Sequence, residues 1–223
     1  MRRSIALAGV VPVLLAGALA ANRAGPSAGV AVDPAVPARV VSVVTGAGLP
    51  TAAQLRKGLL GLADLPAGYT LFDEDSASTT EVPGSGWCRE GTFDRGVPRA
   101  RAHRVFQHSG GSMIDIEIVA TGSRAARDIV RATAAVPTRC PLVEGNYTTK
   151  KFSRLPLPEL GAPAAGLDEM FQDYVGEWSR YYHVVVASGQ VTAIFTEMRG
   201  SEQSRDRFLK LVTTGVGRLA RIR

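Results

Sequence analysis

The first twenty residues carry the feature that most limits how this 223-residue chain can fold. Arg2 and Arg3 precede an apolar run over residues 5–20, which ends in the small residues Ala18 and Ala20. A basic start, a short apolar segment and a small-residue cleavage site together make up a secretory signal peptide. The sequence therefore predicts cleavage near Ala20 and a mature protein secreted into the extracellular or cell-wall space.

A membrane anchor and a lipid anchor are the alternatives for this run, and neither fits it. Its sixteen residues, interrupted by Gly9, Pro12 and Gly17, are fewer than the ~20 that a membrane-spanning helix needs. A lipid anchor needs a cysteine to acylate, and Ala18 stands where that cysteine would be. We therefore expect no stable membrane span, while the paired arginines leave the export route, Sec or twin-arginine, open.

The exported part contains two cysteines, Cys88 and Cys140. In an oxidising compartment, an even pair predicts one disulfide bond. A zinc site and a catalytic thiol are the alternatives, but two sulfurs so far apart, with three scattered histidines, lack the paired spacing of zinc ligands.

Composition divides the chain into three parts. Residues 1–20 form the predicted signal peptide, and residues 21–50 form an Ala/Pro-rich linker, because four prolines prevent regular structure. Residues 51–223 are long enough to bury one core, so we predict a single sensor or binding domain. The formal charge of +6 for the whole chain is spread along it, which favours solubility and argues against nucleic-acid binding.

Apolar periodicity predicts three helices, at residues 51–63, 123–136 and 201–222. Thr51 with Gln54 predicts a capping box at the start of the first helix. Alternating patterns predict strands at residues 69–72, 102–107, 113–120, 147–152, 168–175, 181–187 and 191–198. Glycine-containing turns join 102–107 to 113–120, and 181–187 to 191–198 at Ser188 and Gly189, which predicts two hairpins. This order indicates an α+β fold: an antiparallel β-sheet with helices packed on one face, together with one disulfide. Residues 73–99, around Trp87, form the longest irregular stretch, and long loops are often functional.

One segment resembles a known family. Residues 59–69, with the sequence LLGLADLPAGY, are similar to the opening helix and turn of the PknH-like extracellular sensor domains of actinobacterial receptor kinases, secreted proteins and lipoproteins. The order of elements over residues 51–223 is similar as well. The resemblance implies a sheet-and-helix domain with a cleft for a small extracellular ligand and without catalysis. This chain has two cysteines where the kinase version has four.

Few residues fit a catalytic site. The chain lacks the nucleophile-elbow, dinucleotide and phosphate-loop motifs, and His183 is expected to be a hydrogen-bonded histidine within the sheet. Asp115 and Glu117 lie on one strand face about 7 Å apart. Such a pair could support glycoside hydrolysis or hold a cation, or it could simply face basic residues on a neighbouring strand. We therefore expect no enzyme and no cofactor, with a carboxylate-based hydrolase as an alternative.

Aromatic residues provide the best candidate for a binding surface. Tyr174, Trp178 and Tyr181 are expected to gather at one end of the sheet, near the loop that contains Trp87. Aromatic side chains around a concave surface suit a small apolar or amphipathic ligand, although packing in the core would also explain some of them. The predicted function is an exported, sensor-like module that binds such a ligand in a cleft. The alternative is a protein-interaction or cell-envelope structural module without a small ligand.

Overall fold

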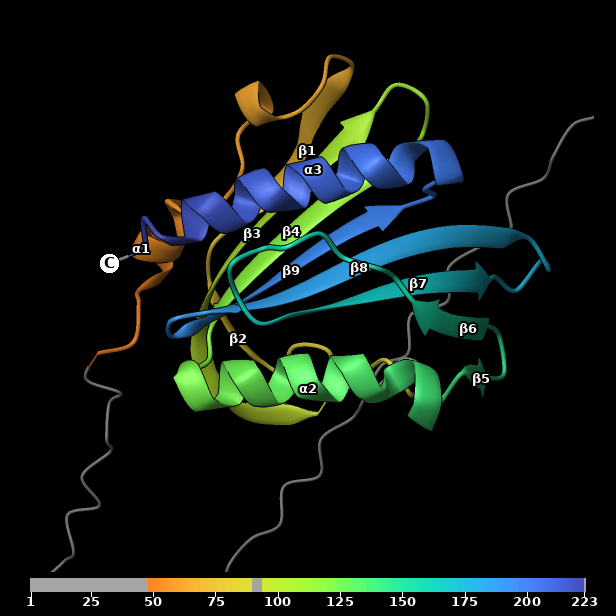
Figure 1. The fold of residues 1–223 in the computed structure, drawn as a ribbon, viewed down its shortest axis with the longest axis horizontal. Coiled ribbons are helices and arrows are strands. Elements are labelled where there is room, and N and C mark those ends of the chain that lie inside the picture. Colours follow the sequence, from red (N-terminus) through yellow and green to blue (C-terminus); the bar gives the residue numbers. More distant parts are fainter. Residues whose placement is uncertain (1–47, 90–93, 223) are drawn as a thin grey trace, which may run out of the picture. The chain divides into compact units, whose positions relative to one another are not determined.

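The computed structural model describes residues 48–89 and 94–222, which form one nine-stranded sheet with helices packed against it (Figure 1). The predicted signal peptide and residues 21–47 of the predicted linker lie outside the described residues. The helices are α1 (Ala52–Arg56), α2 (Ser123–Arg139) and α3 (Glu202–Leu219). The strands are β1 (Tyr69–Asp75), β2 (Ser78–Glu81), β3 (Arg95–His108), β4 (Met113–Ala120), β5 (Leu142–Glu144), β6 (Thr149–Arg154), β7 (Ala164–Gln172), β8 (Trp178–Ser188) and β9 (Val191–Met198).

Every strand pair in the sheet is antiparallel, in the order β1-β3-β4-β9-β8-β7-β6-β5, and β2 pairs with β3. Both predicted hairpins, β3–β4 and β8–β9, are present, and they lie side by side at the centre. The predicted irregular stretch is shorter than expected. β1 runs on to Asp75, and β2 pairs with the first part of β3, because contacts across strands supply order that the local pattern does not reveal.

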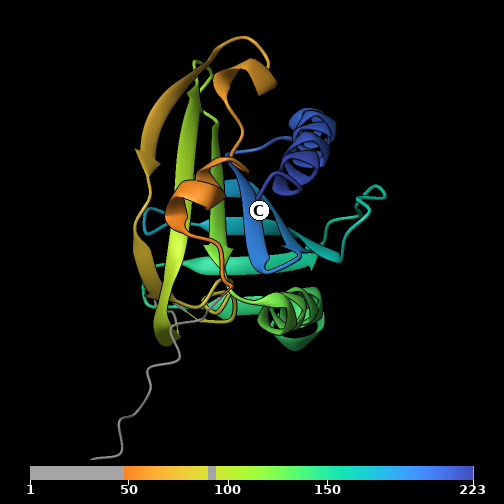
Figure 2. The same cartoon turned by 90° about the vertical axis from the view of Figure 1, so that its left-hand side faces the viewer.

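The helices are divided between the two faces of the sheet. On one face, Phe208 and Val212 of α3 belong to the core that contains Ile116 and Phe195. On the other face, α2 packs against β7 and β8 (Figure 2), with Val130 among its buried residues. In the part of the chain described, no helix has the length and apolar character needed to cross a membrane.

The predicted α+β class, with an antiparallel sheet, helices packed against it and one disulfide, is confirmed. The prediction placed the helices on one face, and in this detail the structure differs. The reason lies in β8, where Val184 and Val186 face α3 while Val185 and Ala187 face α2. An uninterrupted apolar run of this kind is typical of a strand that is covered on both faces.

The first predicted helix is shorter than its apolar pattern indicates. Its capping box is present, since the Thr51 N–H donates to Gln54 Oε1 at 2.8 Å and the Gln54 N–H donates to Thr51 Oγ1 at 3.3 Å. The helix nevertheless ends at Arg56, and a separate 3₁₀ turn follows over Leu62–Asp64. The intervening Gly58 allows close packing, because a Cβ there would lie 2.6 Å from Ile222 Cδ1.

The predicted disulfide between Cys88 and Cys140 is present, with Cα atoms 5.7 Å apart. It joins the loop after β2 to the C-terminal end of α2. Both cysteines pack against a small core cluster that contains Val136 and Phe152. The bond therefore fixes the loop to the same side of the sheet as α2.

Glu197 gives a test of the packing between β9 and α3. Its carboxylate is buried and accepts a hydrogen bond from Ser204 Oγ at 2.9 Å. Burial raises the pKa of the Glu197 carboxyl above its value in the unfolded chain. At pH values above that unfolded-state pKa, ionisation of the buried carboxyl therefore destabilises the fold.

We expect Glu197→Gln to raise the melting temperature at pH 7, and the gain to vanish below about pH 4, where glutamate is protonated in both states. Differential scanning calorimetry between pH 3 and pH 8 measures this effect. Glu177→Gln, at an exposed glutamate, is the control and should change nothing. An equal gain at pH 3 would contradict the explanation.

Candidate ligand-binding cavity

A cavity of about 250 Å³ lies on the α2 face of the sheet, beneath the loop that follows β2. Val82, Pro83 and Trp87 of this loop form its apolar wall. The sheet contributes Asp115, Glu117, Lys150, His183, Ile194 and Thr196. The cavity thus lies between the sheet and a loop, and the ligand cleft stays a prediction.

The Trp87 indole is held in place by packing and by the backbone of its loop. Its ring lies 4.5 Å from the His183 ring and 6.3 Å from the Phe152 ring, measured between centroids. Gly84 has a φ of +73°, and a Cβ at this position would lie 2.7 Å from Trp87 Nε1. A side chain at position 84 would therefore displace the indole, so glycine is needed both for the turn and for the close approach.

A chain of three hydrogen-bonded side chains crosses the floor of the cavity. His183 Nε2 lies 2.7 Å from Glu169 Oε2, and His183 Nδ1 lies 3.0 Å from Thr196 Oγ1. Both the histidine and the glutamate are buried. Each ring nitrogen of His183 therefore has a hydrogen-bond partner, one on each of the two neighbouring strands.

The expected hydrogen-bonded sheet histidine is therefore confirmed, but its partners were not predicted. Glu169, His183 and Thr196 come from β7, β8 and β9, and their contact depends on the register of three strands. The sequence contains one hint, a glutamate within the otherwise mainly apolar segment of β7.

Asp115 and Glu117 form the acidic end of the cavity and pair with basic residues of β3. Glu117 Oε1 accepts from Arg101 Nε at 2.6 Å, and Asp115 Oδ1 lies 2.9 Å from His103 Nε2. Burial raises the pKa of the Glu117 carboxyl, and the hydrogen bond to Asp115 raises the pKa of His103. Pairing with basic residues on a neighbouring strand was one of the interpretations of this carboxylate pair. Within the described residues, no cluster of side chains is suited to holding a metal ion.

The arrangement Glu169–His183–Thr196 has the order acid, histidine and hydroxyl found in nucleophilic catalysis. Acyl transfer also needs hydrogen-bond donors for the developing oxyanion. β9 lies between β4 and β8, and Thr196 is paired with Asp115 on one side and His183 on the other. The backbone at Thr196 is thus paired within the sheet on both sides.

Two of the four predicted ligand-binding residues, Trp87 and Tyr181, lie beside His183. Trp87 lines the cavity, and Tyr181 contacts His183 edge-on at 6.2 Å while stacking on Phe171 at 5.5 Å. The other two residues lie elsewhere. Trp178 is 41% exposed beneath the Lys151 ammonium, and Tyr174 is 80% exposed between β7 and β8. The role of these four residues in ligand binding stays a prediction.

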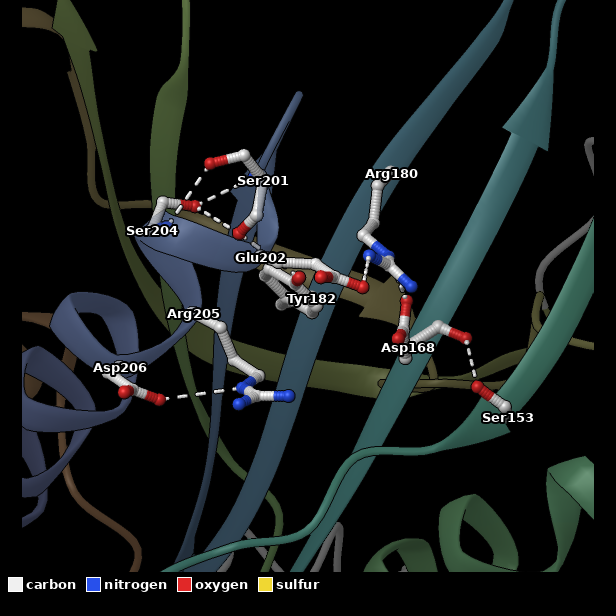
Figure 3. Close-up of polar contacts among 9 residues, drawn as sticks. All are labelled: Ser153, Asp168, Arg180, Tyr182, Ser201, Glu202, Ser204, Arg205 and Asp206. Atoms are coloured by element: carbon white, nitrogen blue, oxygen red, sulfur yellow. Dashed lines mark hydrogen bonds and ion pairs between the residues drawn. The ribbon is translucent and has the colours of Figure 1, made fainter.

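The opposite face of β7 and β8 carries a separate polar cluster (Figure 3). Arg180 Nε donates to Asp168 Oδ1 at 3.0 Å, and Arg180 Nη1 donates to Glu202 Oε1 at 3.3 Å. The Tyr182 hydroxyl donates to the Ser201 carbonyl at 3.1 Å. These contacts attach the start of α3 to the sheet, so this cluster has a structural role.

The structure defines an α+β domain in which a loop covers a cavity on one face of an antiparallel sheet. Its fold is similar to that of the extracellular domain of PknH from Mycobacterium tuberculosis, with a TM-score of 0.52 and 11% identity over 76% of this chain and 98% of that one. An uncharacterised protein from Mycobacterium smegmatis matches with a TM-score of 0.47 and 12% identity, over 75% of this chain and 94% of that one. No protein-family model and no curated protein matches the sequence. The predicted resemblance to PknH-like domains is thus confirmed at the level of the fold.

Proposed function

We propose that this protein is an exported, sensor-like binding module that holds a small amphipathic ligand in the cavity beneath Trp87. The observation that carries this proposal is the construction of the cavity. An indole and aliphatic side chains form one wall, and hydrogen-bonding groups such as Thr196 form the floor. Ligand sites usually combine apolar walls with a few placed polar groups. A volume of about 250 Å³ limits the ligand to a small molecule.

Two further observations support an extracellular role. The disulfide between Cys88 and Cys140 is typical of proteins that fold in an oxidising compartment. The similar solved structure is itself an extracellular domain. We accordingly propose the division into a signal peptide at residues 1–20, a linker at residues 21–50 and a binding domain at residues 51–223.

A second candidate function is a protein-interaction module. β1 is the edge strand of the sheet, and its Leu71 and Phe72 side chains are exposed. An open edge with apolar side chains can pair with a strand of another protein. This candidate needs no small ligand.

Native mass spectrometry of protein purified from culture medium tests the first proposal. We expect the wild type and Trp178→Ala to carry an additional small-molecule mass, and Trp87→Ala to lose most of it, because the mutation removes one wall of the cavity. Circular dichroism should show that both variants are folded. Loss of the additional mass in Trp178→Ala alone would place the site at the turn between β7 and β8. A wild-type protein that carries no additional mass would favour the interaction module.

A further inference from the structure

The charged side chains that line the cavity are separated by sign. Asp115 and Glu117 project from β4, and Glu81 ends β2, which pairs with β3 next to β4. Lys150 projects from β6. The strand order places β9, β8 and β7 between β4 and β6, so about 19 Å separates the two outer backbones at ~4.8 Å per strand. The cavity therefore has an acidic end and a basic end.

The acidic end is rich in hydrogen-bond acceptors. In each of these two carboxylates one oxygen is engaged, Oε1 of Glu117 by Arg101 and Oδ1 of Asp115 by His103, and an ionised carboxylate has further lone pairs to offer. The two basic residues also face Asp75 and Asp73 of β1. The Thr196 hydroxyl, which also lines the cavity, has lone pairs as well. A ligand group at this end must donate hydrogen bonds, and an ammonium group does so while matching the charge.

The basic end has the opposite preference. The Lys150 ammonium can only donate hydrogen bonds, and within the described ranges it takes part in no ion pair. A carboxylate or another anionic group suits this position. Between the two ends, Trp87 and Ile194 offer apolar surface.

We infer that the cavity selects a zwitterionic amphiphile, with its cationic group toward Asp115 and Glu117, an apolar middle against Trp87 and its anionic group toward Lys150. This inference rests on the proposed function. The two charges of the ligand must be separated by several methylene groups, because the acidic and basic side chains lie on strands far apart in the sheet. An α-amino acid backbone is too short to meet both ends.

Four probes with six-carbon chains test the inference: 6-aminohexanoate, hexylamine, hexanoate and hexan-1-ol. The chain has two tryptophans, so Trp178→Phe leaves Trp87 as the only indole, and its fluorescence reports occupation of the cavity. We expect 6-aminohexanoate to bind about tenfold or more tightly than hexan-1-ol, equivalent to ~1.4 kcal/mol. The two singly charged probes should fall between them.

Charge-removing variants in the same background assign each end. Glu117→Gln, with Asp115→Asn as a second variant, should remove only the affinity that the amino group of a probe adds over hexan-1-ol. Lys150→Met should remove only the affinity that the carboxylate of a probe adds. The matched controls lie on the opposite face of the sheet. Asp168→Asn changes an acid that also pairs with an arginine (Figure 3), and Lys151→Met changes the next lysine, which lies over Trp178. Neither control should alter the preference among the probes.

The outcomes separate the two proposals. Equal affinity for all four probes would overturn the inference and leave the proposed function standing. A preference that persists in both Glu117→Gln and Lys150→Met would also overturn it. If no probe changes Trp87 fluorescence, the inference is overturned, and the co-purified mass measured by native mass spectrometry decides the small-ligand function separately.

Discussion

Replacing Cys88 and Cys140 together by alanine is expected to lower the free energy of unfolding by about 4 kcal/mol. The two residues are 52 positions apart, and in the chain-entropy model, closing a loop of this length restricts the unfolded chain by that amount. For a domain of this size, the melting temperature should fall by roughly 8–16 °C. Differential scanning calorimetry measures the change.

Reduction provides the control for this experiment. The wild type with a reductant should melt near the temperature of the double variant, and the double variant should not respond to the reductant. If the double variant melts at the wild-type temperature, the bond does not stabilise the domain.

Phe195→Ala is expected to cost about 3–5 kcal/mol of unfolding free energy. The side chain is 0% exposed in the core beneath α3. α3 approaches it closely at Gly215, where a Cβ would lie 2.4 Å from Phe195 Cε1. Truncation of this ring leaves a cavity that the rigid strand and helix cannot fill. Urea unfolding followed by circular dichroism measures the loss.

Phe72→Ala is the matched control, because Phe72 is 63% exposed on the edge strand β1. Its cost should remain within about 0.5 kcal/mol. Equal losses in the two variants would show that Phe195 does not have the central place in the core that the structure gives it.

The elements with local chemical signals were predicted well from the sequence. The turn at Ser188 and Gly189, the capping box of Thr51 and the pairing of Cys88 with Cys140 are all present. The turn and the capping box depend on residue types that favour one local geometry. The two cysteines pair because the chain offers neither of them another cysteine. The helix predicted over residues 51–63 was too long, because the apolar spacing continues beyond the C-cap at Lys57, where the helix ends.

The candidate site was predicted only in part, because most of it depends on strand register. Trp87 was identified from its position in a long loop, and its place over the cavity agrees with that reasoning. The partners of His183 lie 14 residues before it and 13 after it. The turn at Ser188 and Gly189 predicts that β8 and β9 are neighbours, but no local pattern indicates the register that places Glu169 of β7 beside His183. The opposite charges of Glu117 and Lys150 come into one cavity for the same reason.

Trp87 is the residue immediately before the crosslinked Cys88, and this position affects the thermodynamics of the proposed ligand binding. A loop that is ordered only when a ligand arrives loses conformational entropy at that moment, and the loss weakens affinity. Here a covalent bond to the end of α2 holds the neighbouring residue in the free protein, so much of that entropy is already lost when the chain folds. The indole wall is preorganised, and a ligand that packs against it retains more of its contact energy as affinity.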